Sequence, residues 1–174
     1  MRALKAIVVG GVAAGILDIL YAFVVYGPLS YQLSPLQVLQ SIAAGWMGRE
    51  AASGGGWETG VIGLGSHFLI ALVMAAVFVL AATRIRAFAE RPWLWGFVYG
   101  LILYVAMNYV VVPLSASATG AFATSVADAA ERLQTAFSAL RPRDPFQLVG
   151  TIFTHTAFVG IPTALAAKRY LARD

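Results

Sequence analysis

The 174-residue sequence contains no cysteine and only two histidines. The absence of cysteine excludes disulfide bonds, thiolate metal sites and cysteine nucleophiles. Charged residues are also scarce, at 11% of the chain, whereas hydrophobic residues make up 60% and the mean hydropathy is +0.78. These values lie outside the range of soluble domains and indicate an integral membrane protein. Because the sequence has no G-x-S-x-G, P-loop or H-E-x-x-H motif, we assign no catalytic residues.

Four long apolar stretches account for much of the chain, at roughly residues 4–26, 60–82, 93–112 and 146–167. Each has about 20 residues or more, which as a helix is enough to cross a hydrocarbon layer of ~30 Å. We expect an all-α integral membrane protein, a four-transmembrane-helix bundle in which residues 1–174 form a single membrane domain. The first stretch is too long for a signal peptide and contains Asp18, so we interpret it as a membrane anchor.

Basic residues predict the orientation of these spans. One side of the predicted bundle is flanked by Arg2, Lys5, Arg84, Arg86, Arg91, Lys168, Arg169 and Arg173, whereas the loops on the other side hold Arg49, Arg132, Arg141 and Arg143. The positive-inside rule then places both termini in the cytoplasm, and we predict a multi-pass protein of the bacterial inner (cytoplasmic) membrane. The net charge of +4 needs no nucleic-acid partner, because anionic membrane lipid attracts it.

Each of the two outer loops contains a predicted amphipathic helix. Ser34-Pro35 is a typical helix start, and the first helix has an apolar face made by Leu36, Val38, Leu39, Ile42, Ala43 and Trp46. The corresponding face in the second loop consists of Phe122, Val126, Ala129, Ala130, Leu133, Phe137 and Leu140. Both patterns are typical of interfacial helices, here at the periplasmic boundary.

The exits from the first and third spans are similar in sequence. Pro28-Leu29-Ser30 follows the first span and Pro113-Leu114-Ser115 follows the third. Each exit leads into a predicted amphipathic helix and then into a span with one histidine. We therefore predict two parallel repeats, residues 4–86 and 93–170, related by an axis along the membrane normal.

One strongly polar residue interrupts each span: Asp18, His67, Asn108 and His155. At 1.5 Å per helical residue, all four fall in the outer half of the bilayer to within about one turn. Small residues share the helix faces of these side chains, so the faces are expected to meet other helices rather than lipid. Because polar groups in hydrocarbon are costly, we expect a shared interior site that also includes Tyr104 and Thr151, one turn from Asn108 and His155 respectively.

This predicted site is compatible with three functions. His67 and His155 could ligate haem b or contribute to a metal site, with Asp18 or Asn108 orienting a ring nitrogen. The four residues could instead conduct protons or a small solute. In the third interpretation, their hydrogen bonds only fix the register of the helices. An enzyme acting on a lipid or quinone is less favoured than any of these, so we lean toward a non-enzymatic protein.

The layout of the spans resembles the YagU-like family of uncharacterised bacterial inner-membrane proteins. The resemblance rests on the Gly-rich first span that ends in an aromatic pair, on His67 early in the second span and on Pro113-Leu114 after the third. It also rests on His155 followed by Lys168-Arg169 in the fourth span. The resemblance implies an inner-membrane location and carries over no catalytic residues, and the long first loop departs from the family pattern.

Together, these features predict a small structural or accessory protein of the inner membrane, acting as a homo-oligomer or within a larger membrane complex. The alternatives are an electron-transfer module that binds haem b or a metal, and a transporter of protons or small solutes.

Overall fold

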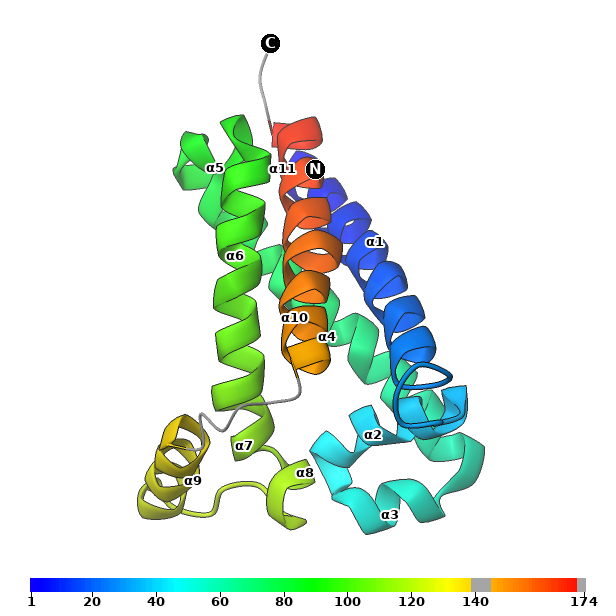
Figure 1. Cartoon of the computed structure of the whole chain (residues 1–174). Coiled ribbons are helices and arrows are strands. Elements are labelled where there is room, and N and C mark those ends of the chain that lie inside the picture. Colours follow the sequence, from blue (N-terminus) through cyan, green and yellow to red (C-terminus); the bar gives the residue numbers. More distant parts are fainter. Residues whose placement is uncertain (139–144, 172–174) are drawn as a thin grey trace. The chain divides into compact units, whose positions relative to one another are not determined.

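The computed structural model describes residues 1–138 and 145–171, and all secondary structure in these ranges is helical (Figure 1). The elements are α1 (Arg2–Val25), α2 (Pro35–Met47), α3 (Arg49–Gly54), α4 (Gly56–Arg84), α5 (Arg86–Glu90), α6 (Pro92–Ala106), η1 (Met107–Val111), α7 (Val112–Leu114), α8 (Ala116–Thr119), α9 (Val126–Ser138), α10 (Pro145–Phe153), η2 (Thr154–Gly160) and α11 (Ile161–Leu171). Of the residues used in the sequence predictions, Leu140, Arg141, Arg143 and Arg173 lie outside the described residues.

The prediction of four helices long and apolar enough to span a membrane is confirmed. Helices long and apolar enough to cross a membrane cover Arg2–Val25, Gly56–Arg84, Pro92–Leu114 and Pro145–Leu171. The third is continuous through α6, η1 and α7, and the fourth through α10, η2 and α11, where η1 and η2 are π-helical segments. The boundaries differ from the predicted ones by a few residues, because helices extend past the hydrocarbon layer into their polar flanks.

The chain divides into two compact units. Unit 1 contains Met1–Tyr21, His67–Tyr104 and Leu148–Asp174, and unit 2 contains Ala22–Ser66 and Val105–Gln147. Unit 1 therefore holds part of every span. Both units draw residues from both predicted repeats, so the units are not the repeats, and the internal repeat stays a prediction.

Small residues bring the helices of unit 1 into backbone contact. A Cβ atom added at Gly11 would lie 2.9 Å from the Cα atom of Leu72, and one added at Gly96 would lie 2.8 Å from the Cα atom of Ile161. At Gly100 the added atom would overlap the backbone of Thr156. Glycine permits this approach because it has no side chain, which is how helices associate in a bilayer without a hydrophobic driving force.

Local capping explains the helices of unit 2 that lie outside the spans. Ser34 caps α2, with its hydroxyl oxygen accepting a hydrogen bond from the Gln37 backbone N–H at 3.3 Å, while the Gln37 side chain accepts one from the Ser34 N–H at 2.8 Å. This reciprocal capping box satisfies two amides at the start of the helix. The predicted helix after Ser34 is thus present. Its position at the periplasmic boundary stays a prediction.

Helix α9 begins with a similar local arrangement. Asp128 accepts hydrogen bonds from the Thr124 backbone N–H at 2.9 Å and from Arg132 Nε at 2.7 Å. The Arg132 hydrogen bond, followed by that of Thr124, lowers the pKa of Asp128 below its usual value. The helix predicted in the second outer loop is therefore present over Val126–Ser138, and Tyr109 stacks on Phe137 at a centroid separation of 5.3 Å.

A substitution in α6 tests the packing of unit 1. We expect Gly100→Ala to lower the melting temperature of the purified protein in detergent. The new methyl group would overlap backbone atoms of Thr156 and His155, so the two helices would have to move apart. The expected loss is about 1–3 kcal/mol of unfolding free energy. Gly65→Ala in α4 is the matched control, since a Cβ atom there meets no described atom within 4 Å. Equal melting temperatures for the two variants would contradict the observed packing.

Candidate functional site

Asp18 in α1 lies against side chains from two other spans of unit 1. Its Oδ1 atom accepts a hydrogen bond of 2.8 Å from the Thr154 hydroxyl group at the start of η2. Its Oδ2 atom is 3.9 Å from Nδ1 of His67 in α4, a contact of ion-pair type. The His67 and Asp18 side chains are 11% and 30% exposed, respectively. We call these three residues, Asp18, His67 and Thr154, the polar clasp.

His67 also contacts α1 through its second ring nitrogen. Nε2 is 2.8 Å from the Gly15 carbonyl oxygen, one turn before Asp18. A carbonyl oxygen can only accept a hydrogen bond, so Nε2 must carry the proton, and Nδ1 is left facing the carboxylate. When Nδ1 is also protonated, the contact with Asp18 becomes an ion pair. Both ring nitrogens of His67 are thus directed at α1.

His155 belongs to a neighbouring group. Its Nδ1 atom donates to the Thr151 carbonyl oxygen at 2.8 Å, which makes Nε2 the acceptor nitrogen of the neutral ring. The imidazole meets the Tyr104 ring edge-on, with a centroid separation of 6.1 Å and an interplanar angle of 84°. His155 follows Thr154 directly in the chain, so this group borders the polar clasp along η2.

Tyr21 lies next to the polar clasp in the chain and packs among aromatic side chains. It lies three residues after Asp18 in α1, and its hydroxyl group lies against Gly150. Its ring contacts those of Phe153 and Phe158 at centroid separations of 6.2 and 5.9 Å. Aromatic side chains thus pack beside the Asp18 carboxylate, and a glycine provides the space for one of them.

The polar residues of the third and fourth spans lie in π-helical turns. Asn108 is in η1, and Thr154 and His155 are in η2. Each segment ends two residues before a proline, Pro113 or Pro162. Proline lacks an N–H group and its ring clashes with the carbonyl four residues earlier, and a widened turn relieves that clash. The Thr156 hydroxyl group donates to the Ile152 carbonyl oxygen at 2.8 Å, which satisfies a backbone acceptor in this stretch.

The structure brings together a subset of the predicted site residues. Asp18 and His67 are in contact, and His155, Thr151 and Tyr104 form the adjoining group. Asn108 belongs to unit 2, where it is half-buried. None of the six predicted residues has a fully exposed side chain, as expected for polar groups in a span. Thr154 and Tyr21 were not predicted, because threonine and tyrosine are common in apolar helices and neither stands out in the sequence.

The described residues do not fit the predicted bis-histidine haem site. Both histidines donate one ring N–H to a backbone carbonyl, as metal-ligating histidines usually do. The nitrogen of His67 that this leaves for a metal is Nδ1, and it faces the Asp18 carboxylate at 3.9 Å. Residues 1–138 and 145–171 also contain no group of three or more His, Cys, Asp or Glu side chains suited to a metal ion. The haem prediction therefore gains no support from the geometry.

No family model, curated protein or solved structure matches this chain. The resemblance to the YagU-like family therefore stays a prediction.

Two threonines in the fourth span give a matched test of the polar clasp. Thr154 bonds to Asp18, whereas the fully buried Thr163 hydroxyl group has no hydrogen-bond partner among the described residues. We expect Thr154→Val to reduce the unfolding free energy by about 0.6–2 kcal/mol, the range for interhelical hydrogen bonds in membranes. Thr163→Val removes an unsatisfied hydroxyl and should be neutral or stabilising. Titration with a denaturing detergent measures both, and equal losses would show that the bond to Asp18 contributes nothing.

Proposed function

We propose that this chain is a non-enzymatic structural or accessory protein of the bacterial inner membrane, in which the polar clasp fixes three spans in one register. The observation that carries the proposal is the set of contacts made by Asp18 and His67. Asp18 contacts side chains of α4 and η2, and His67 donates back to the α1 backbone.

The cost of polar groups in hydrocarbon supports this function. A charged side chain at the centre of a lone helix in a bilayer costs at least about 2.5–3.5 kcal/mol. Here the partners that reduce this cost are supplied by the chain's own spans. His67 directs both ring nitrogens at α1, one in a hydrogen bond to the Gly15 carbonyl and the other toward the Asp18 carboxylate. This arrangement suits a structural role better than a reaction centre.

Location and orientation are part of the same proposal. The excess of basic residues beside the predicted cytoplasmic ends supports cytoplasmic termini and a periplasmic position for α2 and α9. A homo-oligomer would need surfaces other than the glycine faces of unit 1, because Gly11, Gly96 and Gly100 already pack against helices of the same chain. We retain membership of the YagU-like family as a proposal that rests on the sequence pattern alone.

A double-mutant cycle tests whether the polar clasp acts as an interhelical tie. For Asp18→Ala and His67→Ala, measured alone and together, we expect losses of unfolding free energy that are not additive, with a coupling of about 0.5–2 kcal/mol. The control pairs Asp18→Ala with Tyr99→Phe, which removes another interhelical hydrogen bond of unit 1, from Tyr99 to the Met74 carbonyl oxygen. Additivity in the control and coupling in the clasp are expected. Additivity in both cycles would end the proposal.

Proton or small-solute transport through the same residues is the rival function. One observation favours it: two titratable side chains, Asp18 and His67, lie 3.9 Å apart, and the first is 30% exposed. The rival predicts proton flux into liposomes that contain the purified protein, and loss of that flux in Asp18→Asn. We expect the unmutated protein to give no more flux than protein-free liposomes. Proton flux that is lost in Asp18→Asn would contradict the structural role and support transport.

A further inference from the structure

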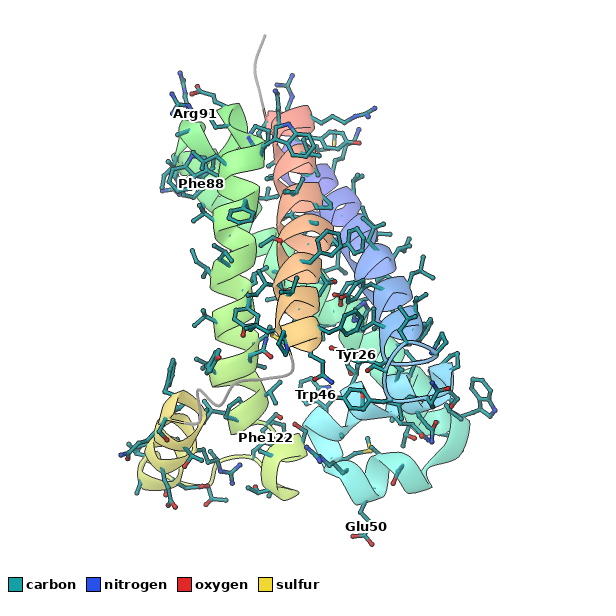
Figure 2. All side chains as sticks on the ribbon, in the orientation of Figure 1. Tyr26, Trp46, Glu50, Phe88, Arg91 and Phe122 are labelled. Atoms are coloured by element: carbon teal, nitrogen blue, oxygen red, sulfur yellow. The ribbon has the colours of Figure 1, made fainter. Side chains whose placement is uncertain are left out.

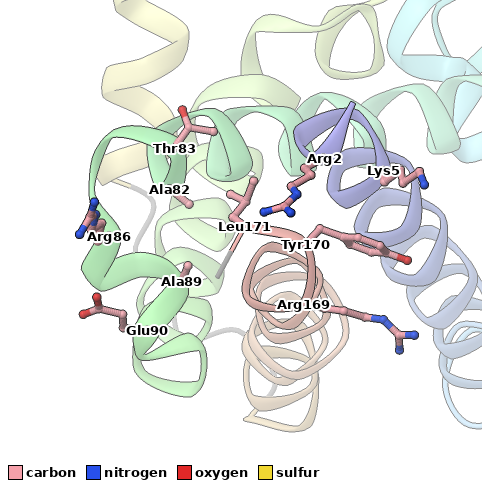
Figure 3. A pocket seen from close by; sticks show the side chains of 10 residues that line it. All are labelled: Arg2, Lys5, Ala82, Thr83, Arg86, Ala89, Glu90, Arg169, Tyr170 and Leu171. Atoms are coloured by element: carbon pink, nitrogen blue, oxygen red, sulfur yellow. The ribbon is translucent and has the colours of Figure 1, made fainter. Parts of the chain in front are cut away.

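A basic cavity opens at the end of unit 1 where α1 begins and where α4 and α11 end (Figure 3). Its volume is about 1420 Å³. It is lined by Arg2, Lys5, Ala82, Thr83, Arg86, Ala89, Glu90, Arg169, Tyr170 and Leu171. We call it the basic basin. All of these residues belong to unit 1 and come from α1, α4, α5 and α11.

The lining separates into a charged rim and a small, apolar floor. Four side chains of the rim are cationic and one, Glu90, is anionic, which leaves a formal excess of three positive charges. The charged residues are exposed, whereas Ala82 and Ala89 are buried at 4% and 6% exposure. Among the described residues, none of the four cations forms a salt bridge. The basin is therefore a concave surface with positive charge that its own carboxylate does not neutralise.

Aromatic packing holds the wall of the basin in place. The short helix α5, which contributes Arg86, Ala89 and Glu90, packs against α11. Phe88 of α5, labelled in Figure 2, stacks on Phe78 at a centroid separation of 5.7 Å and lies 4.6 Å from the Trp95 ring. Phe88 and Trp95 pack on the buried cluster to which Phe78 belongs, formed by Ala6, Phe78, Val79, Ala82, Ala164 and Ala167. The cations thus project from anchored helix ends rather than from a loop.

The position of the basin favours a lipid headgroup as its ligand. The ends of membrane-spanning helices lie at the level of the headgroups, and Trp93, 65% exposed at the start of α6, is typical of that boundary. Basic pockets between the ends of spans bind phosphate-bearing headgroups. Small-ligand pockets have volumes of about 300–1,000 Å³, so this basin has room for more than one phosphate group.

We propose that the basic basin binds the phosphate groups of an anionic phospholipid, and that it prefers a headgroup with two phosphates to one with a single phosphate. Arg86 of α5, Arg169 of α11, and Arg2 and Lys5 of α1 line the basin. In Figure 3 the Arg2 side chain points between the helix ends, and Arg86 and Arg169 lie on opposite sides of the basin. Guanidinium groups suit this role because each can bind a phosphate through two parallel hydrogen bonds. This site is separate from the polar clasp, so failure of either proposal leaves the other standing.

Two variants of equal charge distinguish the basin from a diffuse basic flank. Arg86→Gln with Arg169→Gln removes two cations that line the basin. Arg84→Gln with Lys168→Gln removes two from the neighbouring positions, which do not line it. Native mass spectrometry of the purified full chain in a non-ionic detergent would measure retention of cardiolipin, phosphatidylglycerol and phosphatidylcholine.

We expect cardiolipin to be retained more strongly than phosphatidylglycerol, and phosphatidylcholine least. The lining variant should weaken cardiolipin retention about tenfold or more, and the neighbouring variant about twofold or less. Equal losses in the two variants would overturn the proposal in favour of general attraction to the basic flank. Retention of all three lipids to the same extent would overturn it as well.

Two further measurements complete the test. Inorganic phosphate should not raise the melting temperature of the protein at concentrations where cardiolipin does, and an equal rise would assign the basin to a soluble phosphate compound instead. Glu90→Gln removes the one carboxylate among the described lining residues and should strengthen cardiolipin retention severalfold. This variant tests the proposal even if the lining double variant fails to fold, and unchanged or weaker retention would contradict the assignment.

Discussion

The absence of water from the hydrocarbon layer is the constraint on which the structure of unit 1 depends. A soluble protein can leave a carboxylate to the solvent, whereas a spanning helix must pair it within the protein. Asp18 meets this requirement with partners from two other spans, and His67 meets it with Asp18 and a backbone carbonyl of α1. The π-helical turns follow the same constraint, because Pro162 removes a backbone hydrogen bond where no water can replace it.

The four spans could be predicted because hydropathy is averaged over about 20 residues, and a single polar residue hardly changes that average. The contact between Asp18 and His67 was predictable for a related reason. Two polar side chains at the same depth in a membrane, each on a helix face with small residues, have few other partners available for hydrogen bonds. The start of α2 was readable from Ser34 and Pro35, because capping is a local interaction.

The remaining parts of the site depend on information that a linear pattern does not carry. Thr154 is one of several threonines in the fourth span, and only the rotation of that helix decides which of them meets Asp18. That rotation depends on the widened turn of η2. Depth along the helix also grouped Asn108 with the other polar residues, and because Asn108 belongs to unit 2 that grouping stays a prediction. Depth gives a level in the membrane and says nothing about direction around a helix.

Direction around the helix is what the polar clasp supplies to α1. This helix is apolar on nearly its whole circumference, so hydrophobic patterning cannot select the face that turns inward. Its buried face has small residues at intervals of four, Ala6, Gly10 and Ala14, and the next position in the series is Asp18. Gly11 and Gly15, each one position further round the helix, are buried as well and pack against Leu72 and Phe68, so small residues cover a broad arc of α1. Small-residue packing alone would therefore distinguish poorly between neighbouring rotations.

A carboxylate changes this balance. Rotating α1 by one residue position turns the helix by about 100°, which would move Asp18 away from its partners, either to the place of Leu17, which is 37% exposed, or to that of Ile19, which is buried. Both rotations leave the carboxylate without its partners. A charged side chain without partners at the centre of a span costs at least about 2.5–3.5 kcal/mol, more than a single interhelical hydrogen bond of ~0.6 kcal/mol contributes. The carboxylate therefore contributes to specificity mainly by making the wrong rotations costly, and less by the strength of its bonds in the correct one. Asp18 thus sets the rotation of α1 about its axis. The glycines around it allow the neighbouring helices to pack closely in that rotation.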